Sequence, residues 1–244
     1  MRDSEHESPP ASLRGRLAEV FFPALVAETL EPLLRRLGNL ATVDDPIFGA
    51  SSGLTALGPH MTKLAAWLGE RGARWSKSGA VVGADRDVAE GVLDLRIDHA
   101  QLAIPVAVVA QRGKNRTVEV RVYHATKTLA VDRRGPAPAL PVDNQVPRAA
   151  LDILAALRDK NGGALRDVLQ SDGTVCDARG HEWGRDALEE MFAAAPLVFE
   201  ARAAADDGRL CAVEGVRPSG RSGLVVIQRG ESGLVRSVRV YDED

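Results

Sequence analysis

The sequence predicts an α+β protein built from two tandem copies of one unit. The main observation is a repeated hairpin, because residues 105–123 read PVAVVAQRGKNRTVEVRVY and residues 222–241 read SGLVVIQRGESGLVRSVRVY. Each stretch holds two apolar runs joined by a turn that contains glycine, which is the pattern of a β-hairpin. The two stretches lie about 117 residues apart, which is the size of a domain and far longer than a solenoid repeat.

In the first copy, helical patterns precede strand patterns. Apolar residues recur at helical spacing over residues 13–37 and 57–68, with breaks expected near Pro23 and Pro32. Residues 40–52 between them hold turn residues. Strand patterns follow at residues 75–82, 88–100, 104–111 and 117–123. Helices followed by a meander of strands indicate an α+β layout.

The second copy repeats this order. Helical patterns cover residues 150–157, 165–169 and 188–192, and strand patterns cover residues 197–205, 209–217, 223–228 and 234–241. GLTAL at 53–57 matches GRDAL at 184–188, an offset of 131. This offset exceeds that of the hairpins, so the first copy holds about a dozen more residues before its hairpin. We expect them to lengthen its middle strands.

The domain boundaries follow from composition. Residues 1–11 are polar and mixed in charge, and we expect them to be disordered. The first domain is predicted at 12–125 and the second at 148–244. Residues 126–147 between them contain four prolines and no apolar period, which is typical of a semi-extended linker.

Charge and motifs exclude several classes of function. The 244 residues carry a net charge of −3 without a basic block, so neither nucleic acid nor a membrane is a predicted partner. No signal peptide or membrane span is apparent, and two cysteines suit reduced thiols, which favours the cytoplasm. His181-Glu182 lacks the second histidine of a zinc motif. Nucleotide-binding and nucleophile-elbow motifs are absent too, so we expect no metal and no cofactor.

The order of elements resembles the nuclear transport factor 2-like superfamily, and within it the SnoaL-like group. Gly53 and Leu57, Gly184 and Leu188, and the two Arg-Val-Tyr ends carry this resemblance, twice and over nearly the whole chain. It implies two cone-shaped units, in which helices pack on a curved antiparallel sheet around an apolar cavity. Members of the superfamily include isomerases, polyketide cyclases and binding modules without catalysis, so the fold alone does not fix the function.

These features predict a protein that binds a small hydrophobic metabolite, with isomerase-like or polyketide-cyclase-like catalysis left open. The alternative is a non-catalytic interaction module whose cavities are filled by side chains. In both readings the two copies pack as an intramolecular pseudo-dimer, and further homodimerisation is left open.

Two residues are candidates for catalysis. The alternation along residues 92–100 carries His99 onto the apolar face, where an imidazole can act as a general base. Asp45 precedes the Gly53 helix, where the resemblance places a catalytic aspartate. The first helices contain no tyrosine, so the enolate donor of ketosteroid isomerases is missing. The structural alternatives are a sheet-end imidazole for His99 and a turn residue for Asp45.

Five residues are candidates for the ligand pockets. His60 lies beside an apolar helical stripe, and Asp177 occupies the place of Asp45 in the second copy. Trp67 and Trp75 bracket the turn from helix to strand, and Trp183 precedes the matching helix. Core packing is the alternative for the tryptophans.

The two final strands predict a contact between the sheets. Arg121 and Tyr123 share one strand face, and so do Arg239 and Tyr241. Arginine and tyrosine suit an interface better than an apolar cavity, with an exposed ladder as the alternative. The face of Glu214 cannot be assigned, because both of its faces are equally apolar in sequence.

Overall fold

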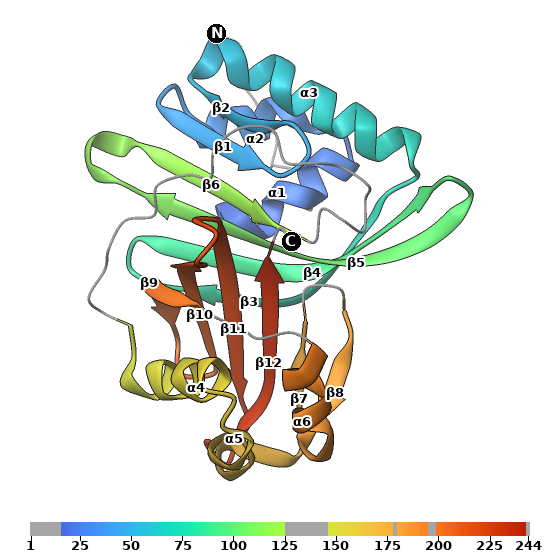
Figure 1. Cartoon of the computed structure of the whole chain (residues 1–244). Helices are drawn as coiled ribbons and strands as arrows, with labels where there is room; N and C mark the ends of the chain where they lie inside the picture. The colour runs from blue at the N-terminus through green and yellow to red at the C-terminus, as the bar shows by residue number, and fades with distance from the viewer. Residues whose placement is uncertain (1–15, 125–145, 178–179, 195–198, 243–244) are drawn as a thin grey trace, which may run out of the picture.

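The computed structural model confirms an α+β protein with two separate six-stranded sheets, each packed against helices (Figure 1). It describes residues 16–124, 146–177, 180–194 and 199–242. We call residues 16–124 the first unit and residues 146–242 the second. The predicted disordered segment 1–11 and nearly all of the predicted linker 126–147 lie outside the described residues.

The first unit contains three α-helices and six strands among its described residues. In chain order they are α1 (Leu17–Val26), α2 (Leu30–Leu37), β1 (Ala41–Asp45), β2 (Gly49–Ser52), α3 (Leu54–Glu70), β3 (Arg74–Val82), β4 (Arg86–Ile97), β5 (Ala100–Arg112), the 3₁₀ turn η2 (Lys114–Arg116) and β6 (Val118–Tyr123).

The described part of the second unit repeats this order. Its elements are α4 (Arg148–Arg158), α5 (Gly162–Val168), β7 (Leu169–Cys176), β8 (Glu182–Gly184), the 3₁₀ turn η4 (Arg185–Ala187), α6 (Leu188–Ala194), β9 (Glu200–Asp206), β10 (Leu210–Val216), β11 (Ser222–Arg229) and β12 (Val235–Asp242).

Both sheets have the same topology. The strand orders are β2-β1-β6-β5-β4-β3 and β8-β7-β12-β11-β10-β9. The neighbours pair antiparallel except β1 with β6 and β7 with β12, which are parallel. The sequence predicts only the antiparallel meander, because β1 and β7 contain the turn residues Asp44-Asp45 and Ser171-Asp172-Gly173. The registers Val43↔Val120 and Val175↔Val238 make each position of one unit comparable with one of the other.

The helices of the first unit differ from the prediction at the prolines. Both Pro23 and Pro32 lie inside helices, and the single break falls between α1 and α2, where Glu28 has a φ of 55°. Pro32 is the third residue of α2, where its missing N–H has no intrahelical partner to lose. The chain therefore turns at Glu28 and not at a proline.

The prediction of longer middle strands in the first unit is confirmed. β4 and β5 span 12 and 13 residues, whereas β10 and β11 span 7 and 8. Their extra length forms the β4–β5 hairpin that projects from the sheet in Figure 1.

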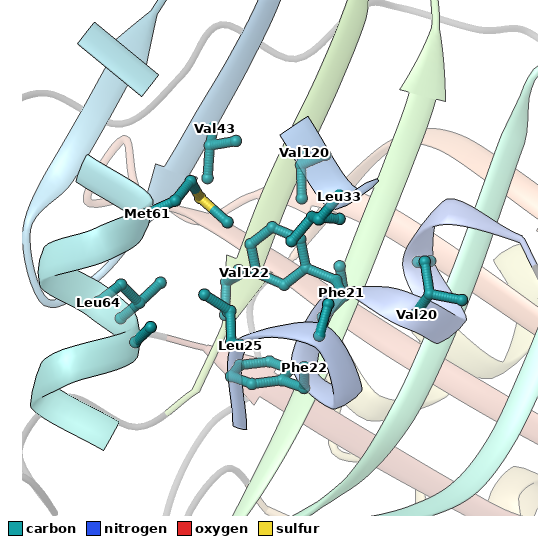
Figure 2. Packing of buried hydrophobic residues seen from close by; sticks show 14 of the residues in the cluster. Val20, Phe21, Phe22, Leu25, Leu33, Val43, Met61, Leu64, Val120 and Val122 are labelled. Carbon is teal, nitrogen blue, oxygen red and sulfur yellow. The ribbon is translucent and has the colours of Figure 1, made fainter. Parts of the chain in front are cut away.

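The core of the first unit lies between its helices and one face of its sheet. Figure 2 shows α1 contributing Val20, Phe21, Phe22 and Leu25 to this core. Residues Leu33, Val43, Met61, Leu64, Val120 and Val122 from the other helices and strands close around them. The second unit has a separate core of the same design. Each unit thus buries its own apolar face.

No helix in the described part of the chain is both long and apolar enough to cross a membrane.

The opposite faces of the two sheets pack against each other. In Figure 1 the strands of the second sheet run across those of the first. A third apolar cluster joins them and includes Val88, Ala107 and Tyr123 from the first unit with Leu224 and Tyr241 from the second. Polar clusters that are described below lie beside these residues.

A Glu-Gly pair recurs on the inter-sheet strands β4 and β10. A Cβ on Gly91 would lie 2.4 Å from the carbonyl oxygen of Ser76, and one on Gly215 would lie 2.3 Å from that of Glu200. Aromatic rings, of Trp75 and Phe199, stand 2.7 and 2.6 Å from the same two points. Only glycine permits this close approach of strand and ring. Glu90 and Glu214, which directly precede these glycines, therefore occupy the same position in the two sheets.

Candidate functional site

A narrow cavity lies in the first unit between the helices and the sheet. Its cavity volume is about 10 Å³. This is room for about one water molecule. Its lining residues are Phe22, Asp45, Ile47, Leu64, Leu68, Leu93, Ile104, Val106, Val122 and His124. Asp45 and His124 are thus the polar side chains of an otherwise apolar wall.

Asp45 ends β1 and is held by three contacts. Its Oδ1 accepts hydrogen bonds from the backbone N–H groups of Ile47 and Phe48, each at 2.9 Å. This is the turn role that the sequence suggests for an aspartate before a proline. Its Oδ2 lies 2.6 Å from Nε2 of His60. Because the Asp45 side chain is only 2% exposed, the carboxylate is fixed at the cavity wall.

His60 reaches Asp45 from the second turn of α3. The helix begins after Gly53, which adopts a φ of 78°. The imidazole is 10% exposed and meets the Phe48 ring edge-on, with 6.3 Å between the ring centroids. Lys63, one turn further along the helix, holds its ammonium group 4.3 Å from the centroid of the Phe48 ring. His60 therefore orients Asp45 through its contact with Oδ2. The Phe48 ring packs against His60, and Lys63 packs against that ring.

His124 is the cavity residue that sequence reasoning missed. It follows β6, where the side chains of Val120 and Val122 point into the core and those of Arg121 and Tyr123 point toward the other sheet. The alternation carries His124 onto the core face, where it is buried. The same pattern is visible in the sequence, one residue beyond the predicted strand.

The arrangement suits proton transfer. A buried carboxylate that faces an apolar space can act as a general base, and an imidazole on the same wall can donate to or accept from a polar group of a ligand. The apolar walls would surround the rest of such a ligand.

The other residues predicted for the first cavity lie elsewhere. β4 ends at Ile97, and Asp98 and His99 form the turn to β5 with φ values of 46° and 69°. His99 is therefore exposed, and the strand alternation that predicted an inward imidazole does not reach it. Trp67 stacks under the Arg71 guanidinium at 4.1 Å. Trp75 stacks on Phe22 with 4.9 Å between the ring centroids, which is the core alternative.

The corresponding residues of the second unit lie near a loop. Oδ1 of Asp177 accepts a hydrogen bond from the backbone N–H of His181 at 2.9 Å, and its Oδ2 lies 3.3 Å from the ring nitrogen Nδ1. The His181 side chain is 65% exposed and meets the Trp183 ring edge-on. The structure thus brings together Asp177 and Trp183 through His181, but not around a described cavity.

Arg121 and Tyr123 meet Glu214 between the sheets. Nε and Nη2 of Arg121 donate to the two oxygens of Glu214 at 2.7 and 2.8 Å, and the hydroxyl of Tyr123 donates to Oε1 at 2.7 Å. Arg86 adds a second cation, with Nε 3.1 Å from Oε2. Glu119, which is half exposed, accepts from Nη1 of Arg121 at 2.9 Å. We call these five residues the Glu214 cluster.

The Glu90 cluster repeats this contact with the units exchanged. Arg239 donates to both oxygens of Glu90, and the Tyr241 hydroxyl donates to Oε2 at 2.9 Å. Ser237 stands in the place of Glu119 and accepts from Arg239. Leu210 pairs with Gln228 as Arg86 pairs with Gln111, so it stands in the place of Arg86. The two clusters are therefore related by an approximate twofold axis, but only the Glu214 cluster holds a second arginine.

The contacts between the sheets lower the pKa of Glu214 and raise the pKa values of Tyr123 and Tyr241. Burial alone would raise the pKa of Glu214, but Arg121, Arg86 and Tyr123 outweigh it and hold the pKa below its usual value. Burial and the facing carboxylates raise the pKa values of Tyr123 and Tyr241 well above their usual value. Both tyrosines thus remain neutral donors in the folded protein.

We expect this to govern an alkaline titration, because Tyr123 and Tyr241 are the only tyrosines of the chain. A tyrosine in an unfolded chain ionises near pH ~10. Since folding raises both pKa values, the folded state loses stability as the pH rises above about 10. Ultraviolet absorbance of tyrosinate should therefore appear together with the loss of the circular dichroism of the strands. Ionisation of either tyrosine while the strands stay intact would contradict this assignment.

Neither cysteine is placed for chemistry. Both are free, and burial raises the pKa of Cys176 to about 11 and that of Cys211 to about 12. A thiol with a raised pKa is a poor nucleophile. Among the described residues, no group of three histidine, cysteine or acidic side chains is arranged to hold a metal ion.

No family model matches the sequence, and no curated protein matches it either. Several solved structures are similar to one unit. A SnoaL-like polyketide cyclase from Shewanella putrefaciens is 14% identical and covers 47% of this chain and 80% of its own, with a TM-score of 0.37. An NTF2-like protein of unknown function from Cytophaga hutchinsonii is 16% identical and covers 41% and 95%, with a TM-score of 0.33.

A Mycobacterium tuberculosis protein in complex with estradiol-17β-hemisuccinate is 15% identical, covers 43% of this chain and 87% of its own, and has a TM-score of 0.35. Each of these matches spans less than half of this chain. The names of the first two agree with the NTF2-like and SnoaL-like resemblance of the sequence.

Proposed function

We propose that the first unit binds a small hydrophobic molecule with one polar group in the cavity that Asp45 and His124 line. The observation that carries this proposal is that a fixed, buried carboxylate and an imidazole lie on the same, otherwise apolar cavity wall. A ligand whose polar group bonds to these two side chains and whose apolar body lies against the rest of the wall would fit this arrangement. A carbonyl compound fits this requirement.

The same contacts support proton transfer next to that carbonyl. Asp45 would take the proton from the carbon beside the carbonyl, and His124 would donate a hydrogen bond to the oxygen as negative charge develops there. Return of the proton to a different carbon isomerises the molecule, and attack of the enolate carbon on a second carbonyl closes a ring. His60 would orient Asp45 and Phe48 would shield the pair from water.

The narrowness of the cavity sets the size of the ligand. With room for about one water molecule, the wall must open before a ring can enter. We therefore expect a compact molecule, and 1-indanone is a suitable probe because it combines one carbonyl with a small apolar body.

We expect 1-indanone to shift the methyl signals of Leu64, Leu68 and Val122 in nuclear magnetic resonance spectra of the full chain, because its aromatic ring would lie against them. The methyl groups of Leu154 and Val225 in the second core serve as the control. Shifts in the first set alone support the proposal. Shifts in both sets, or in neither, would contradict it.

The alternative is a module without a ligand, in which side chains fill both cavities and the sheets serve assembly. The small accessible volume of the first cavity favours it. It predicts that 1-indanone leaves both sets of methyl signals in place. It also predicts that substitutions at Asp45 change only the stability of the protein.

A further inference from the structure

The equal topology of the two units makes their site positions comparable. The register pairs Asp44 with Arg121 in the first sheet and Cys176 with Arg239 in the second, so Asp45 corresponds to Asp177. Both helices after the hairpin carry a buried leucine at the matched place, Leu57 and Leu188, which aligns His60 with Met191. His124 follows Tyr123 as Asp242 follows Tyr241.

The second unit retains the aspartate but neither of the two imidazoles at these positions. A methionine thioether in the place of His60 can neither carry a proton nor pair with a carboxylate. Asp177 instead bonds to the loop residue His181, whose side chain is 65% exposed. Of the three side chains only the aspartate is thus retained, and it lies beside an exposed histidine of a loop.

What the second unit does supply is a contact behind the first site. Arg121 and Tyr123 lie on β6, whose other face places Val122 and His124 in the cavity wall. β6 also pairs with β1 at Asp44, one residue before Asp45. Glu214 binds Arg121 through two hydrogen bonds and Tyr123 through one.

We infer that the second unit carries no working copy of the site and instead positions the site of the first unit, with Glu214 as the positioning residue. Its three hydrogen bonds hold the inter-sheet face of β6 in place. The position of β6 determines that of His124, which follows it in the chain, and that of Asp45, which lies on the paired strand β1. The second copy has become a built-in partner for the first. This inference rests on the proposed function, because it concerns the same cavity.

The approximate twofold axis provides a matched pair of variants. Tyr123→Phe and Tyr241→Phe each remove one hydroxyl from one buried carboxylate, at 2.7 and 2.9 Å. We expect both to lower Tm to a similar extent, by about 3–8 °C. Tyr123→Phe alone should weaken binding of 1-indanone to the full chain, by about fivefold. It alone should also move the imidazole signals of His60, a residue remote from it in sequence.

Two readouts separate the inference from the proposed function. If 1-indanone does not bind the unaltered protein, the proposed function fails, while the His60 signals still report on positioning. Movement of these signals in Tyr123→Phe but not in Tyr241→Phe supports the inference. Equal movement in both variants, movement in neither, or movement in Tyr241→Phe alone would overturn it.

Discussion

Replacement of Glu214 by glutamine is expected to lower the free energy of unfolding by about 3–5 kcal/mol, because removal of one partner leaves other buried charges uncompensated. Glu214 is fully buried and faces two arginines, Arg86 and Arg121, that are themselves 1% and 2% exposed. Glutamine keeps the shape of the side chain but cannot neutralise either cation. The loss is a large part of the stability of an ordinary domain.

Chemical denaturation of the full chain measures this effect, and Glu119→Gln is the matched control. Glu119 also binds Arg121, but its side chain is 49% exposed. Its removal should therefore cost no more than about 1 kcal/mol. Equal losses for the two variants would contradict the account of a buried cluster that holds the sheets together.

The stabilising effect of Glu214 should also depend on pH. Folding lowers its pKa, so its contribution is complete above the pKa of an unfolded glutamate, about 4.3, and is lost as the pH falls through the folded value. In Glu214→Gln this acid-dependent part of the stability should be reduced.

Replacement of Asp45 by asparagine is expected to abolish most proton transfer in the first cavity. The reaction to follow is exchange of the protons beside the carbonyl of 1-indanone with deuterium from heavy water. Loss of a general base typically lowers such a rate by about 10²–10⁴-fold. Asparagine retains an oxygen that can accept from the N–H groups of Ile47 and Phe48, so the turn should survive.

The control for Asp45→Asn is Asp177→Asn, the same change at the matched position of the second unit. Exchange should continue at the rate of the unaltered protein in this variant, because Asp177 lies beside an exposed loop histidine. An equal loss of exchange in both variants, or exchange that survives in Asp45→Asn, would remove Asp45 from the role of base.

The sequence predicts the tandem α+β architecture because the repeated hairpin is a local pattern. The larger offset at the Gly53 helix even predicts the longer β4 and β5. β1 and β7 escape prediction because turn residues interrupt their strand patterns, and both strands are fixed by pairing with neighbours, among them β6 and β12. Tertiary pairing outweighs local propensity there.

The site was harder to predict than the fold. Asp45 and His60 were separate candidates, and their contact depends on how the β1–β2 hairpin packs against α3. The alternation of β4 does not carry His99 inward, because the strand ends at Ile97, two residues before it. The sequence does contain a pattern that indicates the inter-sheet carboxylates, because Glu-Gly-Val occurs both at 90–92 and at 214–216. This repeat marks the positions that face Arg239 and Arg121.

Native mass spectrometry of the purified full chain, beside a denaturing spectrum of the same sample, tests the central claim most directly. A cavity that binds small hydrophobic molecules should retain one of them, so the native mass should exceed the denatured mass by one small molecule per chain. The excess should be lost when Leu68→Trp fills the first cavity. A native mass equal to the denatured mass, unchanged after incubation with 1-indanone, would contradict the claim and favour the interaction module.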